Sequence, residues 1–337
     1  MELSDFLKEW NDSSGRLWVH TSGSTGKPKP MMVEKCRMLN SARITCDFLG
    51  LKPGDTALLC MSLDYIAGKM MVVRSLERGL RLFSVKPCGH PLSDESLQDS
   101  QCVDFDFVAM VPMQVYNSLQ VPKERERLSR IKHLIIGGGA IDDALAAELR
   151  PLPNAVWSTY GMTETLSHIA LRRLNGEEAS DWYQPFDSVK ISTNEDGCLV
   201  IDAPLVCPET LVTHDIVELK EESASSAKSA GEKKILFRIK GRKDNVICSG
   251  GIKIQIEEVE DKLRPHLIVP FMLAKKKDEK FGEISVLITE SHDLQEVECI
   301  CRAVLPKYWI PKEYLHFDQL PLTETGKPKR SILQESI

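Results

Sequence analysis

This sequence has little that would suit a membrane protein or a general nucleic-acid-binding protein. No apolar stretch approaches the roughly 20 residues that a membrane-spanning helix needs. The 43 Lys and Arg residues are outnumbered by 49 Asp and Glu residues, and the net charge of −6 predicts no binding to nucleic acid. The N-terminus, Met-Glu-Leu-Ser-Asp-Phe, is acidic and has no signal-peptide pattern, so we expect a cytoplasmic protein without a membrane span.

Paired cysteines are also missing. The ten cysteines are scattered, none forms a Cys-x-x-Cys pair, and the closest groupings are Cys299 with Cys301 and Cys88 with His90. A structural zinc site needs paired ligands at tighter, repeated spacing. We therefore interpret these residues as the reduced, mostly buried thiols of a cytosolic protein.

Apolar segments with strand and helix spacing alternate along the first half of the chain. The segments that read as strands are residues 56–61, 80–85, 108–112, 131–136 and 155–159. Helical segments lie between or before them, at residues 34–49, 66–77, 113–119 and 141–150. This alternation predicts an α/β fold with a mostly parallel sheet.

The pattern changes in the second half. Residues 187–240 contain short alternating strands, which predict a β-rich part, and the low-complexity residues 220–232 predict a mobile loop within it. Residues 241–337 predict a small α+β domain. We therefore expect a large N-terminal domain over residues 1–240 and a small, mobile C-terminal domain over residues 241–337.

Residues 20–29, His-Thr-Ser-Gly-Ser-Thr-Gly-Lys-Pro-Lys, have the composition of a loop that holds phosphate. Glycines allow the backbone to approach an anion, successive N–H groups form an anion nest, and hydroxyls and lysines bind phosphate oxygens. The loop is not a Walker A motif, because Pro28 follows Gly26-Lys27. On composition alone, a solvated turn is an equal alternative.

Five further segments with polar side chains follow that loop along the chain. They are residues 157–165 (WSTYGMTET), 213–215 (THD), 241–245 (GRKDN), 249–254 (SGGIKI) and 321–329 (PLTETGKPK). In this order, and with residues 20–29, they resemble the adenylate-forming acyl-activating (AMP-binding) superfamily of acyl-CoA ligases, luciferases and peptide-synthetase adenylation domains. The resemblance extends from about residue 17 to residue 330.

The resemblance implies a two-step reaction and its cofactors. A carboxylate attacks the α-phosphorus of ATP, with Mg²⁺ bound, to give an acyl-adenylate and pyrophosphate, and the thiol of coenzyme A then displaces AMP. The implied partners are therefore a small-molecule carboxylate, ATP and coenzyme A. Positioning and electrostatic stabilisation should dominate this catalysis.

The resemblance also implies which residues bind ATP. The β- and γ-phosphates are assigned to Thr21, Ser22, Gly23, Ser24, Thr25, Gly26 and Lys29. The wall beside the adenine and the acyl group is assigned to Gly137, Gly138 and Gly139, and Tyr160 stacks on the adenine. Thr163 contacts the α-phosphate and Glu164 binds Mg²⁺.

Further roles follow for the second half of the chain. Asp215 accepts the ribose hydroxyls, Arg242 supports them, and Lys327 bridges the α-phosphate and the attacking carboxylate. Three of the assigned residues have a plainer alternative. Asp215 can cap a turn, and Glu164 and Lys327 can be ordinary surface residues.

The resemblance assigns the second half-reaction to the C-terminal domain. Asp244 is the hinge about which this domain rotates between half-reactions, and Gly250 and Gly251 line the channel for the pantetheine arm. The sequence makes no prediction about oligomeric state.

The substrate branch is indicated by residues 61–68 (MSLDYIAG) and 73–76 (VRSL), which resemble ligases that activate 2-succinylbenzoate. The early position of the phosphate loop, near residue 20, likewise resembles its position in N-terminally shortened members of that branch. Arg74 would then bind the second carboxylate of a dicarboxylate, because a guanidinium forms a bidentate fork, and Ser167 and His168 would add hydrogen bonds. An exposed helix arginine and a core histidine are the alternatives for Arg74 and His168.

Two departures from that branch leave other functions open. Tyr65 stands where many relatives have histidine, and His214 replaces the small residue common between Thr213 and Asp215. The alternatives are another acyl- or aryl-CoA ligase and a non-catalytic ATP-binding homologue.

Overall fold

The protein is described by a computed structural model that covers residues 1–20, 30–99, 104–223, 233–321 and 330. Contacts within the chain divide it into two units. Unit 1 comprises Met1–Ile191, Ile201–Leu211 and Leu219–Arg238, and unit 2 comprises Ser192–Val200, Val212–Glu218 and Ile239–Ile337. Within the described residues, no helix is both long enough and apolar enough to cross a membrane.

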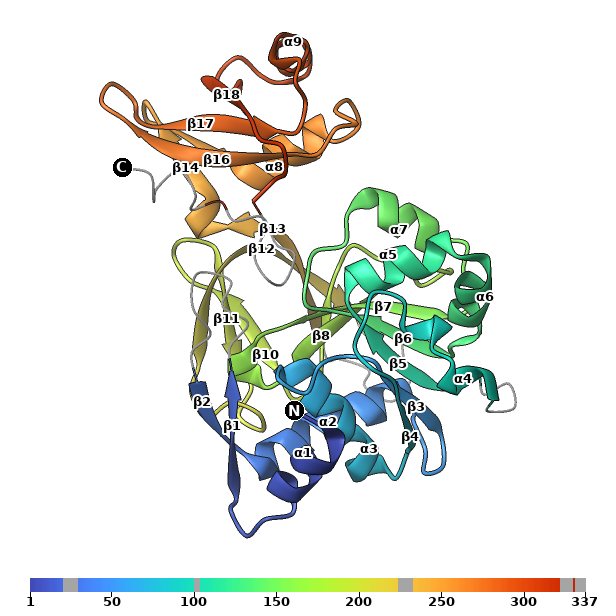
Figure 1. Ribbon diagram of the computed structural model, residues 1–337. Helices are drawn as coiled ribbons and strands as arrows, with labels where there is room; N and C mark the ends of the chain where they lie inside the picture. The colour runs from blue at the N-terminus through green and yellow to red at the C-terminus, as the bar shows by residue number, and fades with distance from the viewer. Residues whose placement is uncertain (21–29, 100–103, 224–232, 322–329, 331–337) are drawn as a thin grey trace. The chain divides into compact units, whose positions relative to one another are not determined.

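Unit 1 is built on a seven-stranded sheet with the order β4-β3-β5-β6-β7-β8-β9 (Figure 1). Its strands are β3 (Thr56–Leu59), β4 (Arg81–Ser84), β5 (Phe107–Met110), β6 (His133–Ile136), β7 (Ala155–Gly161), β8 (His168–Arg173) and β9 (Gln184–Pro185). Strands β3 to β7 pair in parallel, and β8 and β9 are antiparallel additions at one edge. The predicted α/β fold with a mostly parallel sheet is confirmed.

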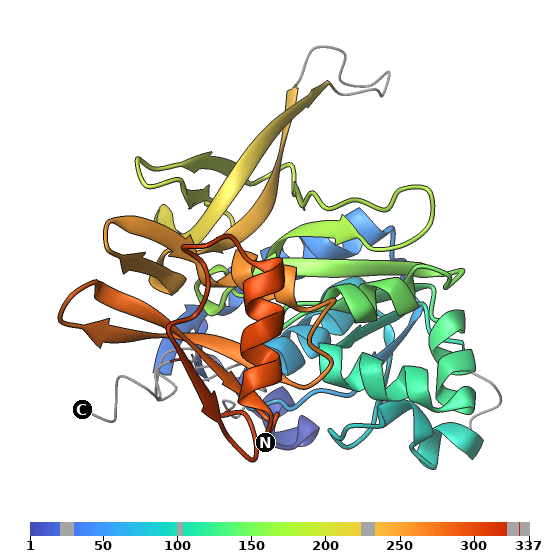
Figure 2. The same ribbon diagram turned by 90° about the horizontal axis from the view of Figure 1, so that it is seen from above.

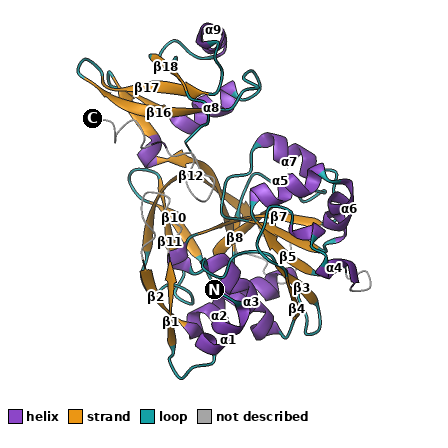
Figure 3. Ribbon diagram, in the orientation of Figure 1, coloured by secondary structure: helices purple, strands orange, loops and turns teal. Residues whose placement is uncertain are grey.

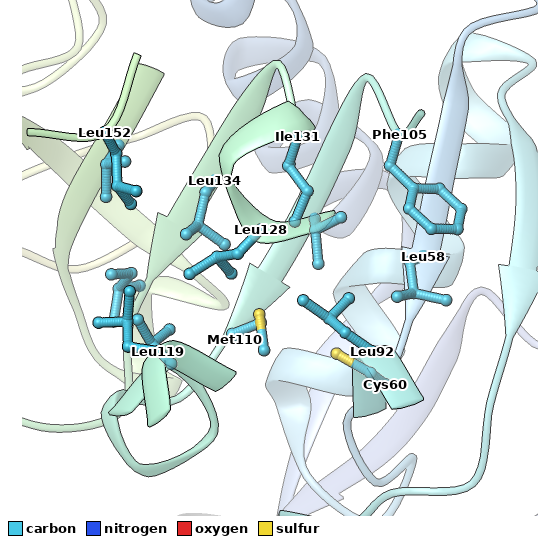
Figure 4. Close-up of a cluster of buried hydrophobic side chains, with 14 of the residues drawn as sticks. Leu58, Cys60, Leu92, Phe105, Met110, Leu119, Leu128, Ile131, Leu134 and Leu152 are labelled. Atoms are coloured by element: carbon cyan, nitrogen blue, oxygen red, sulfur yellow. The ribbon is translucent and has the colours of Figure 1, made fainter. Parts of the chain in front are cut away.

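Helices cover both faces of this sheet. On one face lie α5 (Pro112–Gln120), α6 (Pro122–Arg130) and α7 (Asp143–Leu149), and on the other α2 (Lys35–Leu49) and α3 (Ile66–Arg78). The first face forms a core in which Leu58, Met110 and Leu134 of the strands meet Leu119 and Leu128 of the helices (Figure 4). Successive strand residues point to opposite faces of the sheet, and helices cover both faces. Both sets of strand side chains are therefore buried and apolar.

Smaller elements of the chain lie outside this sheet. Helix α1 (Leu3–Trp10) precedes a hairpin of β1 (Arg16–His20) and β2 (Pro30–Glu34), and η1 (Pro91–Ser93) and α4 (Ser96–Asp99) precede β5. A four-stranded sheet has the order β10-β11-β12-β13, with bounds Lys190–Thr193, Cys198–Asp202, Leu211–Ser223 and Lys233–Arg242. Strands β12 and β13 form the long yellow-to-orange pair in Figure 2. Residues 220–223 belong to β12, so they are strand where a loop was predicted, and residues 224–232 lie outside the described residues.

Unit 2 contains a five-stranded sheet with the order β15-β14-β17-β16, and β18 pairs in parallel with β17 (Figure 3). After η3 (Lys243–Asn245), its elements are β14 (Val246–Ser249), β15 (Ile252–Gln255), α8 (Ile256–Leu263), β16 (Phe271–Asp278), β17 (Gly282–Thr289), α9 (Leu294–Val304) and β18 (Glu313–His316). Val259 of α8 and Val297 of α9 pack with Leu273 and Leu287 of the sheet in one core.

Candidate active site

The loops that follow β6 and β7 lie at the same edge of the unit 1 sheet, because these neighbouring strands run in parallel. Gly137 directly follows β6, and a Cβ built on it would lie 2.4 Å from the Thr159 Oγ1 atom of β7. Gly138 has a φ of 81°, which favours glycine. The structure therefore brings Gly137–Gly139 close to the segment that contains Tyr160.

The chain reverses tightly between β7 and β8. A Cβ on Gly161 would lie 2.3 Å from the Ser167 carbonyl oxygen and 2.4 Å from the His168 Cα atom, so only glycine fits there. The Thr165 hydroxyl accepts a hydrogen bond from the Met162 N–H at 3.1 Å and lies 2.7 Å from the Ser167 carbonyl. This compact turn presents Thr163 and Glu164, in η2 (Thr163–Thr165), at the carboxyl edge of the sheet.

The predicted nucleotide residues of this turn differ in exposure. Tyr160 is buried, and its ring packs edge-on against Phe237 with centroids 5.0 Å apart. Thr163 is buried, whereas the Glu164 side chain is exposed and makes no ion pair or hydrogen bond with the residues that the structure describes. A single accessible carboxylate fits Mg²⁺, which takes most of its other ligands from phosphate oxygens and water.

Arg74, which projects from α3, is buried, with 2% of its surface exposed. One terminal nitrogen, Nη2, donates a hydrogen bond to the Ser167 hydroxyl, and Nη1 contacts the Met71 sulfur at 4.0 Å. Its Nε atom has no hydrogen-bond partner, and no Asp or Glu in the described part of the chain forms an ion pair with it. Burial lowers the pKa of Arg74 to about 10, so the guanidinium is still charged at neutral pH.

His168 lies beside this guanidinium and is buried as well. Its Nδ1 atom is 3.2 Å from the Ser167 hydroxyl, and its Nε2 atom is 3.1 Å from the Thr45 hydroxyl of α2. Burial, together with the charge of Arg74, holds the pKa of His168 well below its usual value of 6.5. The imidazole is therefore neutral, and Arg74, Ser167 and His168 form one connected group.

In unit 2, a second polar group joins Asp215, Arg242 and Asp244. The Arg242 guanidinium donates to Asp215 at 3.0 Å and to Asp244 at 3.0 Å. The His214 Nδ1 atom lies 2.9 Å from both carboxylate oxygens of Asp244. Burial raises the pKa of Asp244, but its hydrogen bonds to His214 and Arg242 outweigh burial and lower the pKa overall.

A pocket of about 480 Å³ opens beside this group. Its lining residues are Asn194, Cys198, Val212, Thr213, His214, Lys243, Asp244 and Lys275. Sequence reasoning marked His214 only as a departure from the family pattern and missed the ion pair of Lys243 with Asp196 at 2.6 Å. The position of His214 between Thr213 and Asp215 in the sequence is the signal that could have placed it at this site.

Gly250 and Gly251 form the two-residue turn between β14 and β15, with Ser249 paired to Ile252. Their φ values are 56° and 85°, and both positive values are what such a hairpin turn requires. The turn geometry is thus a structural reason for both glycines, in addition to the channel role that the resemblance implies.

Two groups of predicted residues lie outside the described residues. They are the phosphate loop (Thr21, Ser22, Gly23, Ser24, Thr25, Gly26 and Lys29) and the catalytic candidate Lys327. Arg330, three residues after Lys327, is described, and both of its terminal nitrogens donate to the buried Glu260 carboxylate at 2.8 Å.

Comparisons with known proteins identify the family of this chain. The AMP-binding enzyme family matches residues 9–202. A solved acyl-CoA synthetase (AMP-forming)/AMP-acid ligase II-like protein from Dyadobacter fermentans is 34% identical, with a TM-score of 0.63, and the match covers 98% of this chain and 92% of that one.

Proteins named for 2-succinylbenzoate are more distant. A 2-succinylbenzoate–CoA ligase of Bacillus mycoides is 24% identical over 338 residues, which cover 95% of this chain and 69% of the relative. The O-succinylbenzoate coenzyme A synthetase (MenE) of Bacillus subtilis, solved with ATP and a magnesium ion, shares the fold at 22% identity and a TM-score of 0.71, covering 94% of this chain and 69% of that one. With the parallel sheet and the loops at its edge, the matches show that this chain belongs to the AMP-binding enzyme family and is an AMP-forming acyl-CoA ligase.

Proposed function

We propose that the chain uses ATP and Mg²⁺ to adenylate 2-succinylbenzoate and then transfers the acyl group to coenzyme A. One observation supports a dicarboxylate most strongly: the Arg74 guanidinium is buried and charged, and no carboxylate of the described residues pairs with it. A substrate carboxylate would supply the missing partner. The names of the relatives from Bacillus point to the same acid.

An unpaired buried charge is costly enough to need an explanation. Desolvating a guanidinium without a counter-ion costs several kcal/mol, and proteins normally pair such a group. Arg74 has a free Nε–H and only weak contacts at Nη1, so a carboxylate can bind it through two hydrogen bonds. The only carboxylate of a monocarboxylic acid reacts with ATP, so such an acid would have no second carboxylate to pair with this cation.

In the proposed adenylation step, the protein binds and orients ATP and the acid. The loop at residues 20–29 holds the β- and γ-phosphates, Tyr160 and Gly137–Gly139 bind the adenine, and Thr163 contacts the α-phosphate. Glu164 would hold Mg²⁺, which neutralises phosphate charge when bound. Lys327 would stabilise the negative charge that develops between the acid and the α-phosphate.

The thioester step is assigned to residues of unit 2. Asp215 and Arg242 would retain the ribose, Asp244 would act as the hinge, and Gly250 and Gly251 would border the path of the pantetheine thiol. We propose the cytoplasm as the place of this reaction.

ATP–pyrophosphate exchange over a panel of acids tests this proposal. The panel contains 2-succinylbenzoate, 4-oxo-4-phenylbutanoate, which lacks the ring carboxylate, benzoate and a straight-chain fatty acid. We expect the fastest exchange with 2-succinylbenzoate and a raised KM for that acid in Arg74→Ala. Exchange only with monocarboxylates would refute the assignment of 2-succinylbenzoate as the substrate. ATP binding without any exchange would favour a non-catalytic homologue.

A further inference from the structure

We propose that Thr45 and His168 form a positioning relay that fixes Arg74 through Ser167 and leaves its positive charge uncompensated for a substrate anion. This inference rests on the proposed role of Arg74 as the partner of a substrate carboxylate. It assigns a function to Thr45, which lies on α2 and about 120 residues before His168 in the sequence.

The relay is a continuous series of hydrogen bonds inside unit 1. Arg74 Nη2 donates to the Ser167 hydroxyl, whose oxygen lies 3.2 Å from His168 Nδ1. On the other side of the ring, His168 Nε2 lies 3.1 Å from the Thr45 hydroxyl, which donates to the Ser41 carbonyl at 3.1 Å. Both ends of the imidazole are therefore held.

The direction of these bonds assigns the proton on His168. Thr45 has one hydroxyl proton, and it is given to the Ser41 carbonyl one helical turn earlier. Thr45 must then accept a hydrogen bond from Nε2–H, which leaves Nδ1 as an acceptor for the Ser167 hydroxyl proton. The Ser167 oxygen is thus free to accept from Arg74, and every donor in the series points away from the guanidinium.

The chemistry of residue 168 explains why the charge stays available. A carboxylate at this position would neutralise Arg74, and a protonated histidine would repel it. A neutral imidazole does neither, and burial together with Arg74 holds the pKa of His168 well below its usual value. The Phe186 ring, 5.7 Å from the imidazole between centroids, adds no charge. The relay therefore orients the guanidinium without pairing it.

Two Thr45 variants and a matched control test the relay in the enzyme of residues 1–337. Thr45→Val keeps the shape of the side chain but removes the hydroxyl, and Thr45→Ser retains a hydroxyl. The control, Ser75→Ala, removes another buried helix hydroxyl, which donates to the Met71 carbonyl at 2.9 Å. Each is assayed for kcat/KM with 2-succinylbenzoate and with 4-oxo-4-phenylbutanoate.

We expect Thr45→Val to lower kcat/KM about five- to tenfold more for the dicarboxylate than for the monocarboxylate, which corresponds to one hydrogen bond. Thr45→Ser should restore most of this difference, and Ser75→Ala should affect both acids equally. Equal losses for the two acids in Thr45→Val would overturn the relay, because they would indicate a purely structural role.

Substitutions at His168 separate the two ends of the ring. His168→Asn places an amide near the Nδ1 position and retains an acceptor for Ser167, whereas His168→Gln places its amide near the Nε2 position, toward Thr45. We expect His168→Asn to retain more of the preference for the dicarboxylate than His168→Gln. The opposite order would show that Ser167 is not positioned through the Nδ1 end of the ring.

A spectroscopic measurement tests the relay without reference to activity. In protein labelled with ¹⁵N-histidine, the His168 signals, identified by their loss in His168→Asn, should show a neutral ring with the proton on Nε2. A proton on Nδ1, or a charged ring at neutral pH, would overturn the relay. If the enzyme showed no preference for dicarboxylates while His168 had the expected tautomer, the proposed function would fail and the relay geometry would stand.

Discussion

Replacing Arg74 with methionine should make the protein more stable and less active. Methionine retains an unbranched, apolar side chain in α3 but removes the buried charge. Burial lowers the pKa of Arg74 from its ordinary value to about 10, and at roughly 1.4 kcal/mol per pKa unit the charged group costs about 3 kcal/mol in the folded state. Losing the hydrogen bond to Ser167 offsets about 1 kcal/mol of this, so we expect a net gain of about 2 kcal/mol.

The sign of this effect follows from linkage. A base whose folded pKa is lowered destabilises the protein at every pH below that pKa, and the cost disappears only as pH rises from about 10 toward the ordinary pKa of arginine. The gain from Arg74→Met is therefore complete at neutral pH. A natural enzyme that retains such a cost is consistent with a functional need for the charge.

Urea unfolding followed by tryptophan fluorescence is a suitable assay. In a Trp309→Phe background, the fluorescence reports on unit 1 alone, because it contains the other four tryptophans, Trp10, Trp18, Trp157 and Trp182. Arg78→Met is the matched control on the same helix. Arg78 donates to Asp47 at 2.5 Å and to the Leu51 carbonyl at 2.8 Å, so its loss should lower stability. A lower stability of Arg74→Met would refute the reasoning, because it would mean that Arg74 is a structural residue.

Three further predictions concern the second half of the chain. Lys327→Ala should abolish adenylation and largely preserve thioester formation from a supplied acyl-adenylate, and equal losses in the two half-reactions would contradict its role. Asp244→Pro should slow thioester formation more than pyrophosphate exchange, and the reverse pattern would exclude residue 244 as the hinge. Glu260→Leu should cost about 3–5 kcal/mol of unit 2 stability, measured by amide exchange in β16, because it leaves Arg330 without its bidentate partner. Glu260→Leu with Arg330→Met should recover most of that loss, and no recovery would show that the charge left on Arg330 is not its cause.

Local patterns in the sequence were sufficient to predict much of the α/β unit. The helix expected at residues 34–49 is α2, and Gly50 ends it in the left-handed conformation with a φ of 65°. The helix expected at residues 66–77 is α3, which Gly79 ends in the same way. Such signals are local, since they depend on apolar spacing and on the one residue type that readily adopts positive φ.

Helix α6 was missed in the sequence analysis for a physical reason. Helix α6 (Pro122–Arg130) has the sequence PKERERLSR, and only Leu128 gives it an apolar anchor. Its Glu124 is buried and accepts hydrogen bonds from Ser93 at 2.6 Å and from Ser118 at 2.8 Å. A polar residue that is buried through distant partners cannot be recognised from hydrophobic periodicity.

The same limit applies to the site. Arg74, Ser167 and His168 were proposed through the family resemblance, but nothing in the sequence showed that Arg74 has no carboxylate partner among the described residues or that Thr45 reaches His168. The contact between His214 and Asp244 joins residues 30 positions apart, and it likewise needed the structure. Tertiary contacts, and the burial they cause, decide which of these polar groups are paired.

A competition between two acids tests the central claim most directly. The enzyme is incubated with ATP, Mg²⁺, coenzyme A and equal concentrations of 2-succinylbenzoate and 4-oxo-4-phenylbutanoate, and early thioester products are quantified by mass spectrometry. Their ratio equals the ratio of the two kcat/KM values. We predict at least a tenfold excess of the 2-succinylbenzoyl thioester, the equivalent of about 1.4 kcal/mol from one charge-assisted contact. Equal amounts of the two thioesters, or an excess of the monocarboxylate product, would contradict the assignment of Arg74 to a second substrate carboxylate.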